Sequence, residues 1–164
     1  MGVDELQSHR IVQMAAFQVG SEDYVIDIMR IKEIINPQKI TPVHDDTGLL
    51  EGVINLRGSI IPVIDLRKRF GLSPSERPKA SKIIIAVVDD RVVGFWVDEV
   101  MEVIRIPRSH IKPPPALGEH MEPGLILGVC QSDERLLLLL NLKKVLTPSF
   151  FRAKSEKISS EGEV

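Results

Sequence analysis

The chain has 164 residues, of which 43% are hydrophobic and 27% charged. This length suffices for one globular domain, or for two small lobes that share a core. A net charge of −2 and an aromatic content of 4% exclude a strongly basic nucleic-acid-binding protein and a base-stacking surface. The leucine run at residues 136–140 is far shorter than the ~18 residues that cross a membrane, so we expect no direct membrane insertion.

The cysteine content and the first residues bear on the compartment. The single cysteine, Cys130, rules out an intramolecular disulfide and favours a reducing environment. Residues 1–12 contain early acidic side chains and lack the apolar segment of a signal peptide. We therefore expect a cytoplasmic protein.

The first half of the chain consists of short, Val- and Ile-rich segments. Residues 12–19 and 24–28 predict two strands of a hairpin. The isoleucines within residues 28–35 fall at helical spacing, which indicates a short helix before Pro37. Residues 60–66 predict a strand in which Pro62 marks an edge or a bulge.

The second half continues in the same way. Residues 71–82 are polar and proline-containing, which indicates a loop, and residues 83–88 and 92–97 predict a second hairpin. Residues 107–124 are again loop-like, and residues 136–142 predict the last strong strand. Such short, regularly spaced strands are typical of a β-barrel or a β-sandwich.

The sequence also contains an internal repeat. GVINLRGSIIPVIDLRKRF, from Gly52, aligns without a gap on GVCQSDERLLLLLNLKKVL, from Gly128, and residues 31–35 match residues 100–104 more loosely. We infer two lobes of one β design that pack together. The copies differ at the expected turn, where NLRG at 55–58 places Arg57 between apolar runs and SDER at 132–135 is typical of a solvated hairpin turn.

No motif indicates catalysis or a cofactor. The four histidines are far apart in sequence and lack metal-ligand spacing, and no phosphate- or dinucleotide-binding motif occurs. An enzyme would require at least two of Asp27, Asp98, His110 and Cys130 to converge in a pocket. Local context instead predicts an inert thiol at Cys130, a solvated strand edge at Asp98 and a solvated charge run at residues 67–69. We expect no enzyme, no metal and no cofactor.

Five segments together resemble the CheW family of bacterial chemotaxis adaptors. They are FQVGSEDYVIDIMRIKEII (17–35), ITPV (40–43), GVINLRGSIIPVIDLRKRFG (52–71), VVGFWVDEVMEVIRIP (92–107) and LLLLNLKKVL (137–146). They occur in the order of the family and cover most of residues 14–148.

This resemblance implies a fold and a domain organisation. The implied fold is all-β, with two SH3-like five-stranded β-barrel lobes packed around a shared hydrophobic core, and with short helices. A single CheW-like domain would occupy residues 1–151, with interleaved lobes and the second lobe at roughly 83–140. Residues 152–164 have little to bury and are expected to be a disordered tail.

The resemblance also implies a function without catalysis or cofactor. CheW-like adaptors couple chemoreceptors (methyl-accepting chemotaxis proteins) to the regulatory domain of a CheA-type histidine kinase, in arrays on the inner face of the membrane. The receptor partner is the cytoplasmic tip of its helical hairpin. The alternative is an adaptor of the same fold in a non-chemotactic pathway, such as pilus motility or development.

Site residues follow from matching the family motifs. Arg57 matches the arginine associated with receptor coupling, and the receptor-binding candidates are Ile31, Glu33, Gly52, Asn55, Arg57 and Gly58. Lys112 and Leu117, in a proline-rich loop, are the kinase-binding candidates; a rigid connector is the alternative there. Arg57 has an alternative role inside the protein, bonded to Glu33, Asp65 or backbone carbonyls. Turn geometry is the alternative for Gly52 and Gly58.

The composition of the tail generates a first prediction. Deletion of residues 152–164 should change neither the melting temperature nor the affinity for the kinase domain, because this segment has few apolar side chains to bury. Thermal unfolding and a calorimetric titration of the full and shortened chains measure both. A clear loss of kinase affinity in the shortened chain would contradict the prediction.

Overall fold

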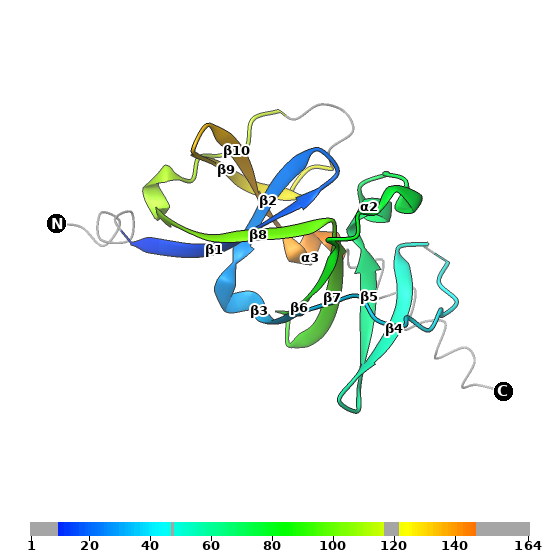
Figure 1. Cartoon of the computed structure of the whole chain (residues 1–164). Helices are drawn as coiled ribbons and strands as arrows, with labels where there is room; N and C mark the ends of the chain where they lie inside the picture. Colours follow the sequence, from blue (N-terminus) through cyan, green and yellow to red (C-terminus); the bar gives the residue numbers. More distant parts are fainter. Residues whose placement is uncertain (1–9, 47, 117–121, 147–164) are drawn as a thin grey trace.

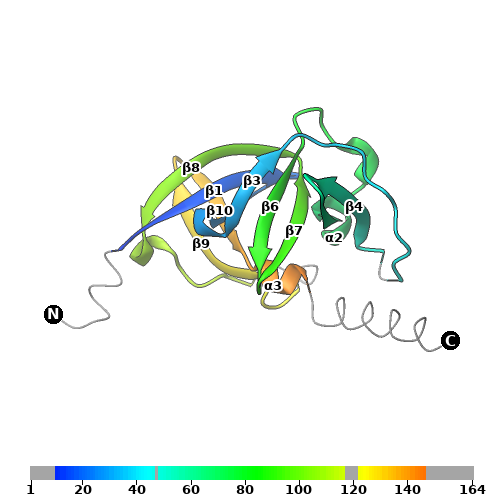
Figure 2. The same ribbon diagram turned by 90° about the horizontal axis from the view of Figure 1, so that it is seen from below.

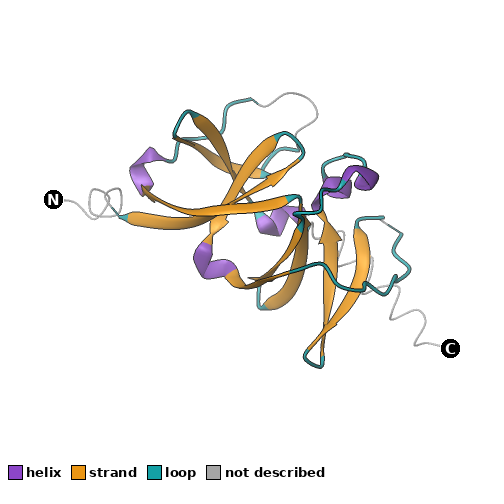
Figure 3. Ribbon diagram, viewed as in Figure 1, coloured by secondary structure: helices purple, strands orange, loops and turns teal. Residues whose placement is uncertain are grey.

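The computed structural model describes residues 10–46, 48–116 and 122–146. In these residues ten strands form two five-stranded sheets, and the helices are short (Figure 3). The all-β class with two five-stranded lobes is therefore confirmed. Leu117 and the tail at 152–164 lie outside the described residues.

The strands of each sheet come from both halves of the chain. Sheet I contains, in order across the sheet, β8 (Glu99–Pro107), β1 (Ile11–Val19), β2 (Glu22–Asp27), β10 (Arg135–Leu140) and β9 (Ile126–Ser132). Sheet II contains β3 (Ile31–Ile35), β6 (Lys82–Val88), β7 (Arg91–Val97), β5 (Ser59–Asp65) and β4 (Leu50–Leu56). The segment 83–140, expected as the second lobe, thus supplies most of β6 and all of β7 to sheet II, and β8, β9 and β10 to sheet I.

The two sheets exchange their third strands. β3 follows the β1–β2 hairpin along the chain but pairs with β6, whereas β8 follows the β6–β7 hairpin but pairs with β1. The remaining hairpins, β4–β5 and β9–β10, join through parallel pairs of β5 with β7 and of β10 with β2. Seen from below, β1, β8, β9 and β10 lie on one side of the molecule and β4 on the other (Figure 2).

The internal repeat corresponds to equivalent structure. β4–β5 and β9–β10 are equivalent hairpins, and each leads into one turn of helix, α2 (Leu66–Arg69) or α3 (Leu142–Val145). Each helix begins with an aligned polar residue whose side chain accepts a backbone N–H, Asp65 from Arg67 and Asn141 from Lys144. The two copies therefore share strands, turn and cap.

The helix expected at residues 28–35 is only partly present. η1 (Ile28–Arg30) is a short 3-10 turn, and the Asp27 side chain accepts the Met29 N–H at 2.9 Å. The remaining residues form β3, with Ile31 opposite Ala86 and Ile35 opposite Ile83. Pairing with β6 overrides the helical spacing, because β-branched isoleucines fit a pleated sheet well.

The expectation of an edge or a bulge at Pro62 is also modified. β5 is an inner strand, flanked by β4 and β7. Its parallel pairing with β7 begins only at Val63, so Pro62 faces Val53 of β4 and has no partner in β7. Because proline lacks an N–H, it is tolerated at this position, which has no partner on the β7 side.

A shared hydrophobic core lies between the sheets. Phe17 and Tyr24 of sheet I pack in one cluster with Ile64, Ile84 and Phe95 of sheet II. Each sheet also has a smaller cluster of its own. Burial of each large aliphatic or aromatic side chain contributes about 1.5–3 kcal/mol, so the shared cluster is a major stabilising contact between the lobes.

Two aligned glycines permit a close approach of backbones. Gly52 lies beside the bridge between Thr41 and Val53, and Gly128 lies beside the bridge between Lys112 and Val129. A Cβ would come within 2.3 Å of the Thr41 carbonyl oxygen at Gly52, and within 2.9 Å of the Lys112 carbonyl oxygen at Gly128. Both are too short for a carbon–oxygen contact, so the segments after β3 and β8 require glycine here.

We expect Gly52→Ala to lower the free energy of unfolding by about 2 kcal/mol, and Gly128→Ala by less. The difference follows from the shorter contact at Gly52, 2.3 Å against 2.9 Å to a carbonyl oxygen, and from the Gly52 φ of 155°, which L-residues rarely adopt. Urea unfolding followed by tryptophan fluorescence measures both variants against the wild type. An unchanged midpoint for Gly52→Ala would contradict the close approach.

Candidate functional site

The candidate site is built on the turn between β4 and β5, at the end of the hairpin that projects from the molecule in Figure 1. Arg57 and Gly58 are the two central residues, with φ of 51° and 89°. Two-residue loops with positive φ match the twist of hairpin strands. The Gly58 N–H donates to Asn55 Oδ1 at 2.9 Å, which stabilises the turn. Asp133 and Glu134 have the same positive φ in the β9–β10 turn, so hairpin geometry accounts for the Arg57 backbone.

An ion pair joins this turn to β3. Arg57 Nη2 donates to Glu33 Oε2, so the intramolecular partner considered for Arg57 is present. β3 and β4 are the outermost strands of sheet II, and the pair therefore links its two edges. Gln38 Nε2 also donates to the Asn55 carbonyl oxygen at 3.1 Å, from the segment that follows β3. Together these contacts close sheet II at the end that carries the turn.

Sheet I has a corresponding pair. Arg135, next to the β9–β10 turn, lies 3.5 Å from Glu102, which the loose repeat aligns with Glu33. Arg135 also donates to Asp23 at 3.0 Å and to the sulfur of Met101 at 3.1 Å. In sheet II an arginine of the β4–β5 hairpin thus meets a glutamate of β3, and in sheet I an arginine of the β9–β10 hairpin meets a glutamate of β8. The two arginines do not occupy aligned positions in the sequence repeat.

A groove of about 710 Å³ adjoins the Arg57–Glu33 pair. Its lining comes from β3, the β4–β5 hairpin and the β6–β7 hairpin, and includes Lys32, Glu33, Leu56, Arg57, Ile60 and Val92. Ile60 is 64% exposed, so a large aliphatic side chain lies open to solvent in the groove. The groove therefore combines apolar walls with a charged rim, as protein-binding surfaces do.

The receptor-binding candidates are not all surface residues. Glu33, Asn55, Arg57 and Gly58 meet at the turn, as described above. Gly52, in contrast, is buried in β4 against Thr41, where its role is the close approach of two backbones. Ile31 is half-buried and packs against the shared core, so it contributes to packing as well as to the surface.

Lys112, one of the two kinase-binding candidates, lies away from the Arg57 turn. Lys112 forms two backbone hydrogen bonds of 2.8 Å with Val129 of β9, so it belongs to sheet I and not to the Arg57 turn. Its side chain is exposed. Leu117 lies outside the described residues.

The four residues considered for an enzyme site do not form one cluster. The Asp27 side chain caps η1, and the Asp98 carboxylate pairs with Arg67. His110 and Cys130 line one open hollow, but Cys130 is buried in the core of sheet I and burial raises the pKa of its thiol. A protonated, buried thiol is a poor nucleophile.

Neither a metal site nor a membrane-spanning helix is found within the described ranges. No group of three or more His, Cys, Asp or Glu side chains there is placed to hold a metal ion. No helix there is long and apolar enough to cross a membrane.

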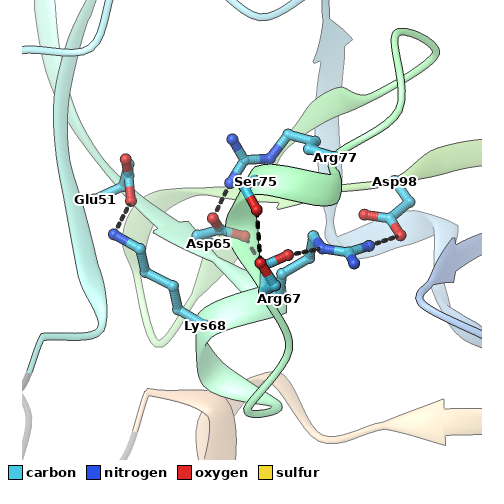
Figure 4. A network of polar contacts seen from close by, with 8 residues as sticks. Glu51, Asp65, Arg67, Lys68, Ser75, Arg77 and Asp98 are labelled. Carbon is cyan, nitrogen blue, oxygen red and sulfur yellow. Dashed lines mark hydrogen bonds and ion pairs between the residues drawn. The ribbon is translucent and has the colours of Figure 1, made fainter.

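A buried polar network is the main feature that sequence reasoning missed (Figure 4). Arg67 and Asp98 were expected to be solvated, yet their side chains are only 8% and 7% exposed and form an ion pair. Asp65, fully buried, accepts from Arg77, whose guanidinium lies 3.5 Å from the centre of the Trp96 ring system. Asp65 caps α2 by accepting the Arg67 N–H, so the Asp-x-Arg spacing in the sequence reflects this cap and gives no signal of the buried network.

Comparisons with known proteins agree with this architecture. The family model described as "CheW-like domain" matches residues 13–149. The chain is 31% identical to "Chemotaxis protein CheW" of Helicobacter pylori, over 91% of this chain and 90% of that protein. It is 36% identical to "Chemotaxis protein CheW" of Bacillus subtilis, over 82% of this chain and 86% of that protein. The crystal structure of the scaffolding protein TtCheW from Thermoanaerobacter tengcongensis superposes with a TM-score of 0.77 at 33% identity, covering 84% of this chain and 89% of that one.

The buried state of Cys130 generates a prediction. A thiol-specific disulfide reagent at about pH 8 should leave Cys130 unmodified in the folded protein, because the reactive thiolate is disfavoured by burial. The unfolded chain in urea is the control and should react fully. Rapid labelling of the folded protein would contradict this prediction.

The raised pKa of Cys130 also predicts how stability depends on pH. Because unfolding frees the thiol to ionise near its ordinary pKa of 9.0, the free energy of unfolding should fall as the pH rises above that value.

Proposed function

Because the chain belongs to the CheW family of chemotaxis scaffolding proteins, we propose that it is a non-catalytic adaptor that couples chemoreceptors to a CheA-type histidine kinase. CheW scaffolding proteins are non-catalytic. We place the adaptor in the cytoplasm, at receptor arrays on the inner face of the membrane. Its partners are the cytoplasmic tip of the receptor and the regulatory domain of the kinase.

The exposed ion pair at the β4–β5 turn carries this proposal. The Arg57 side chain is 70% exposed although it pairs with Glu33, which is 33% exposed. Arginine offers five donors in a planar fork, so the N–H groups that do not face Glu33 can reach carboxylates or carbonyls of a helical hairpin tip. In this proposal Glu33 presents Arg57, while Asn55, Gly52 and Gly58 shape the hairpin that carries it.

Two separate surfaces suit an adaptor. The receptor surface is the part of sheet II around Arg57, Glu33 and Ile31. The kinase surface includes Lys112, beside sheet I, and Leu117, which lies outside the described residues. Because Lys112 is bonded to β9 and Arg57 follows β4, the two proposed surfaces belong to different lobes. An adaptor of the same fold in a pilus-motility or developmental pathway would use the same surfaces, and the receptor that binds would distinguish the two functions.

A titration with charge-reversed variants tests the role of Arg57. Purified wild type, Arg57→Ala and the double variant Glu33→Arg/Arg57→Glu are titrated by calorimetry with the kinase regulatory domain and with the receptor's cytoplasmic fragment. We expect Arg57→Ala to bind the kinase normally and the receptor at least about tenfold more weakly. Its stability should change by only about 0.2–1 kcal/mol, as for other exposed pairs.

The double variant separates the two roles of Arg57. It restores an internal ion pair with reversed charges, so restored receptor binding would assign Arg57 a purely internal role, and continued loss supports direct contact. Lys143→Ala is the control, because Lys143, 64% exposed, forms a surface ion pair with Asp89 at 3.2 Å, away from the turn. If the wild type binds neither partner, the proposed function is wrong.

A further inference from the structure

A hollow of about 530 Å³ opens at the end of sheet I where β1 begins and β2 ends. Its apolar walls include Ile11, Ile28, Met29, Ile111 and Leu139. Met29 is 87% exposed and Ile11 is 49% exposed, so two large apolar side chains lie open to water among the described residues. Because burial of apolar surface is favourable, a segment that covers this end of the sheet would gain free energy.

The rim of this hollow is basic. Arg10 and Arg108 both line it, and the Arg108 N–H donates to the Arg10 carbonyl oxygen at 2.8 Å, which holds the two residues side by side. Within residues 10–46, 48–116 and 122–146, no carboxylate pairs with either guanidinium. The lining also contains Asp27, but its side chain already accepts the Met29 N–H. A segment that fits the hollow should therefore combine apolar side chains with negative charge.

Sheet II shows what covers the equivalent position. When the β6–β7 hairpin is aligned on the β1–β2 hairpin at their turns, Trp96 corresponds to Asp27. The Arg77 guanidinium lies 3.5 Å from the centre of the Trp96 ring system and pairs with Asp65 (Figure 4). Arg77 belongs to residues 71–81, the segment directly before β6. In sheet II, therefore, the chain that precedes the hairpin folds back over the end of the sheet.

The corresponding segment of sheet I is residues 1–9, which precede the described part of the chain. Its sequence, MGVDELQSH, places apolar and acidic side chains next to one another at Val3, Asp4, Glu5 and Leu6. The segment joins the described chain at Arg10, which itself lines the hollow. Nine extended residues span about 30 Å, so the segment begins at the hollow and is long enough to cross it.

We infer that residues 1–9 fold back over this hollow and cover the end of sheet I, as residues 71–81 cover the end of sheet II. The two acidic side chains of the segment face the two arginines of the rim, and its apolar side chains lie against the apolar walls. Because the segment is tethered at the rim, its effective concentration there is high and no second chain is needed. The cover shields Met29, which lies in η1, where the chain passes from sheet I to sheet II.

Methionine oxidation tests the cover in the full chain. Hydrogen peroxide transfers one oxygen atom to a methionine sulfur, which gives the sulfoxide and water, and the rate follows the exposure of the sulfur. Mass spectrometry of peptides measures the rate at Met29 and at Met101, a residue of β8 that does not line the hollow. In Asp4→Lys/Glu5→Lys, repulsion from the basic rim should release the segment. We expect Met29 to be oxidised at least about fivefold faster than in the wild type, and Met101 at an unchanged rate.

Two further variants separate the cover from a general effect of charge. Glu161→Lys/Glu163→Lys is the matched control, because it changes the net charge by the same amount in the last residues of the chain, and it should leave the Met29 rate unchanged. Adding Arg10→Glu/Arg108→Glu to the variant with two lysines in the first segment restores opposite charges across the rim, so the protection of Met29 should return.

Two results would overturn the inference. One is an equal oxidation rate at Met29 in the wild type and in Asp4→Lys/Glu5→Lys. The other is a protection of Met29 that disappears when the wild type is diluted, because a second copy of the chain would then be the occupant. The measurements involve neither a receptor nor a kinase, so their outcome does not depend on the proposed function.

Discussion

The exchange of β3 and β8 between the sheets is the constraint on which the rest of the structure depends. Each sheet obtains an edge strand from the hairpin unit of the other, so neither sheet is complete until both halves of the chain have met. The shared core around Phe17 and Phe95 forms only in that arrangement. The position of Glu33 also follows from the exchange, because β3 carries it to the edge of sheet II opposite the Arg57 turn. The fold and the candidate site therefore have one common origin.

Local patterns predicted six of the ten strands of the described residues, including the β1–β2 and β6–β7 hairpins, because a hairpin and its turn depend on residues close in sequence. They assigned no strand to β4, β8 or β9. The ungapped match of Gly52 on Gly128 anticipated two equivalent hairpins, and both glycines have the same structural task beside a bridging segment. The partners of β3 and β8 were not predictable, because an exchanged and an unexchanged strand present the same isoleucine and valine pattern. The helix predicted at 28–35 failed for a related reason, since pairing with β6 decides that segment.

The candidate site shows the same division between local and distant information. Asn55, Arg57 and Gly58 are neighbours in one turn, and sequence reasoning brought them together. Glu33 was considered as a partner of Arg57, and the structure makes that contact. The burial of Arg67 had no local signal, because a run of three basic residues ordinarily faces water. Its partner Asp98 lies far along the chain, and the crossing that brings them together is a property of the topology.

The strand exchange also bears on how such a chain arises. One half supplies two hairpins and one strand that only another half can accommodate, so a half-length chain would complete its sheets only by associating with a second copy. Joining two copies in tandem turns that association into an intramolecular event, which no longer depends on protein concentration. Once joined, the halves are free to diverge, as the turn residues Arg57 and Asp133 have done. Two faces that began alike thereby become different, as the proposed function of linking two unlike partners requires.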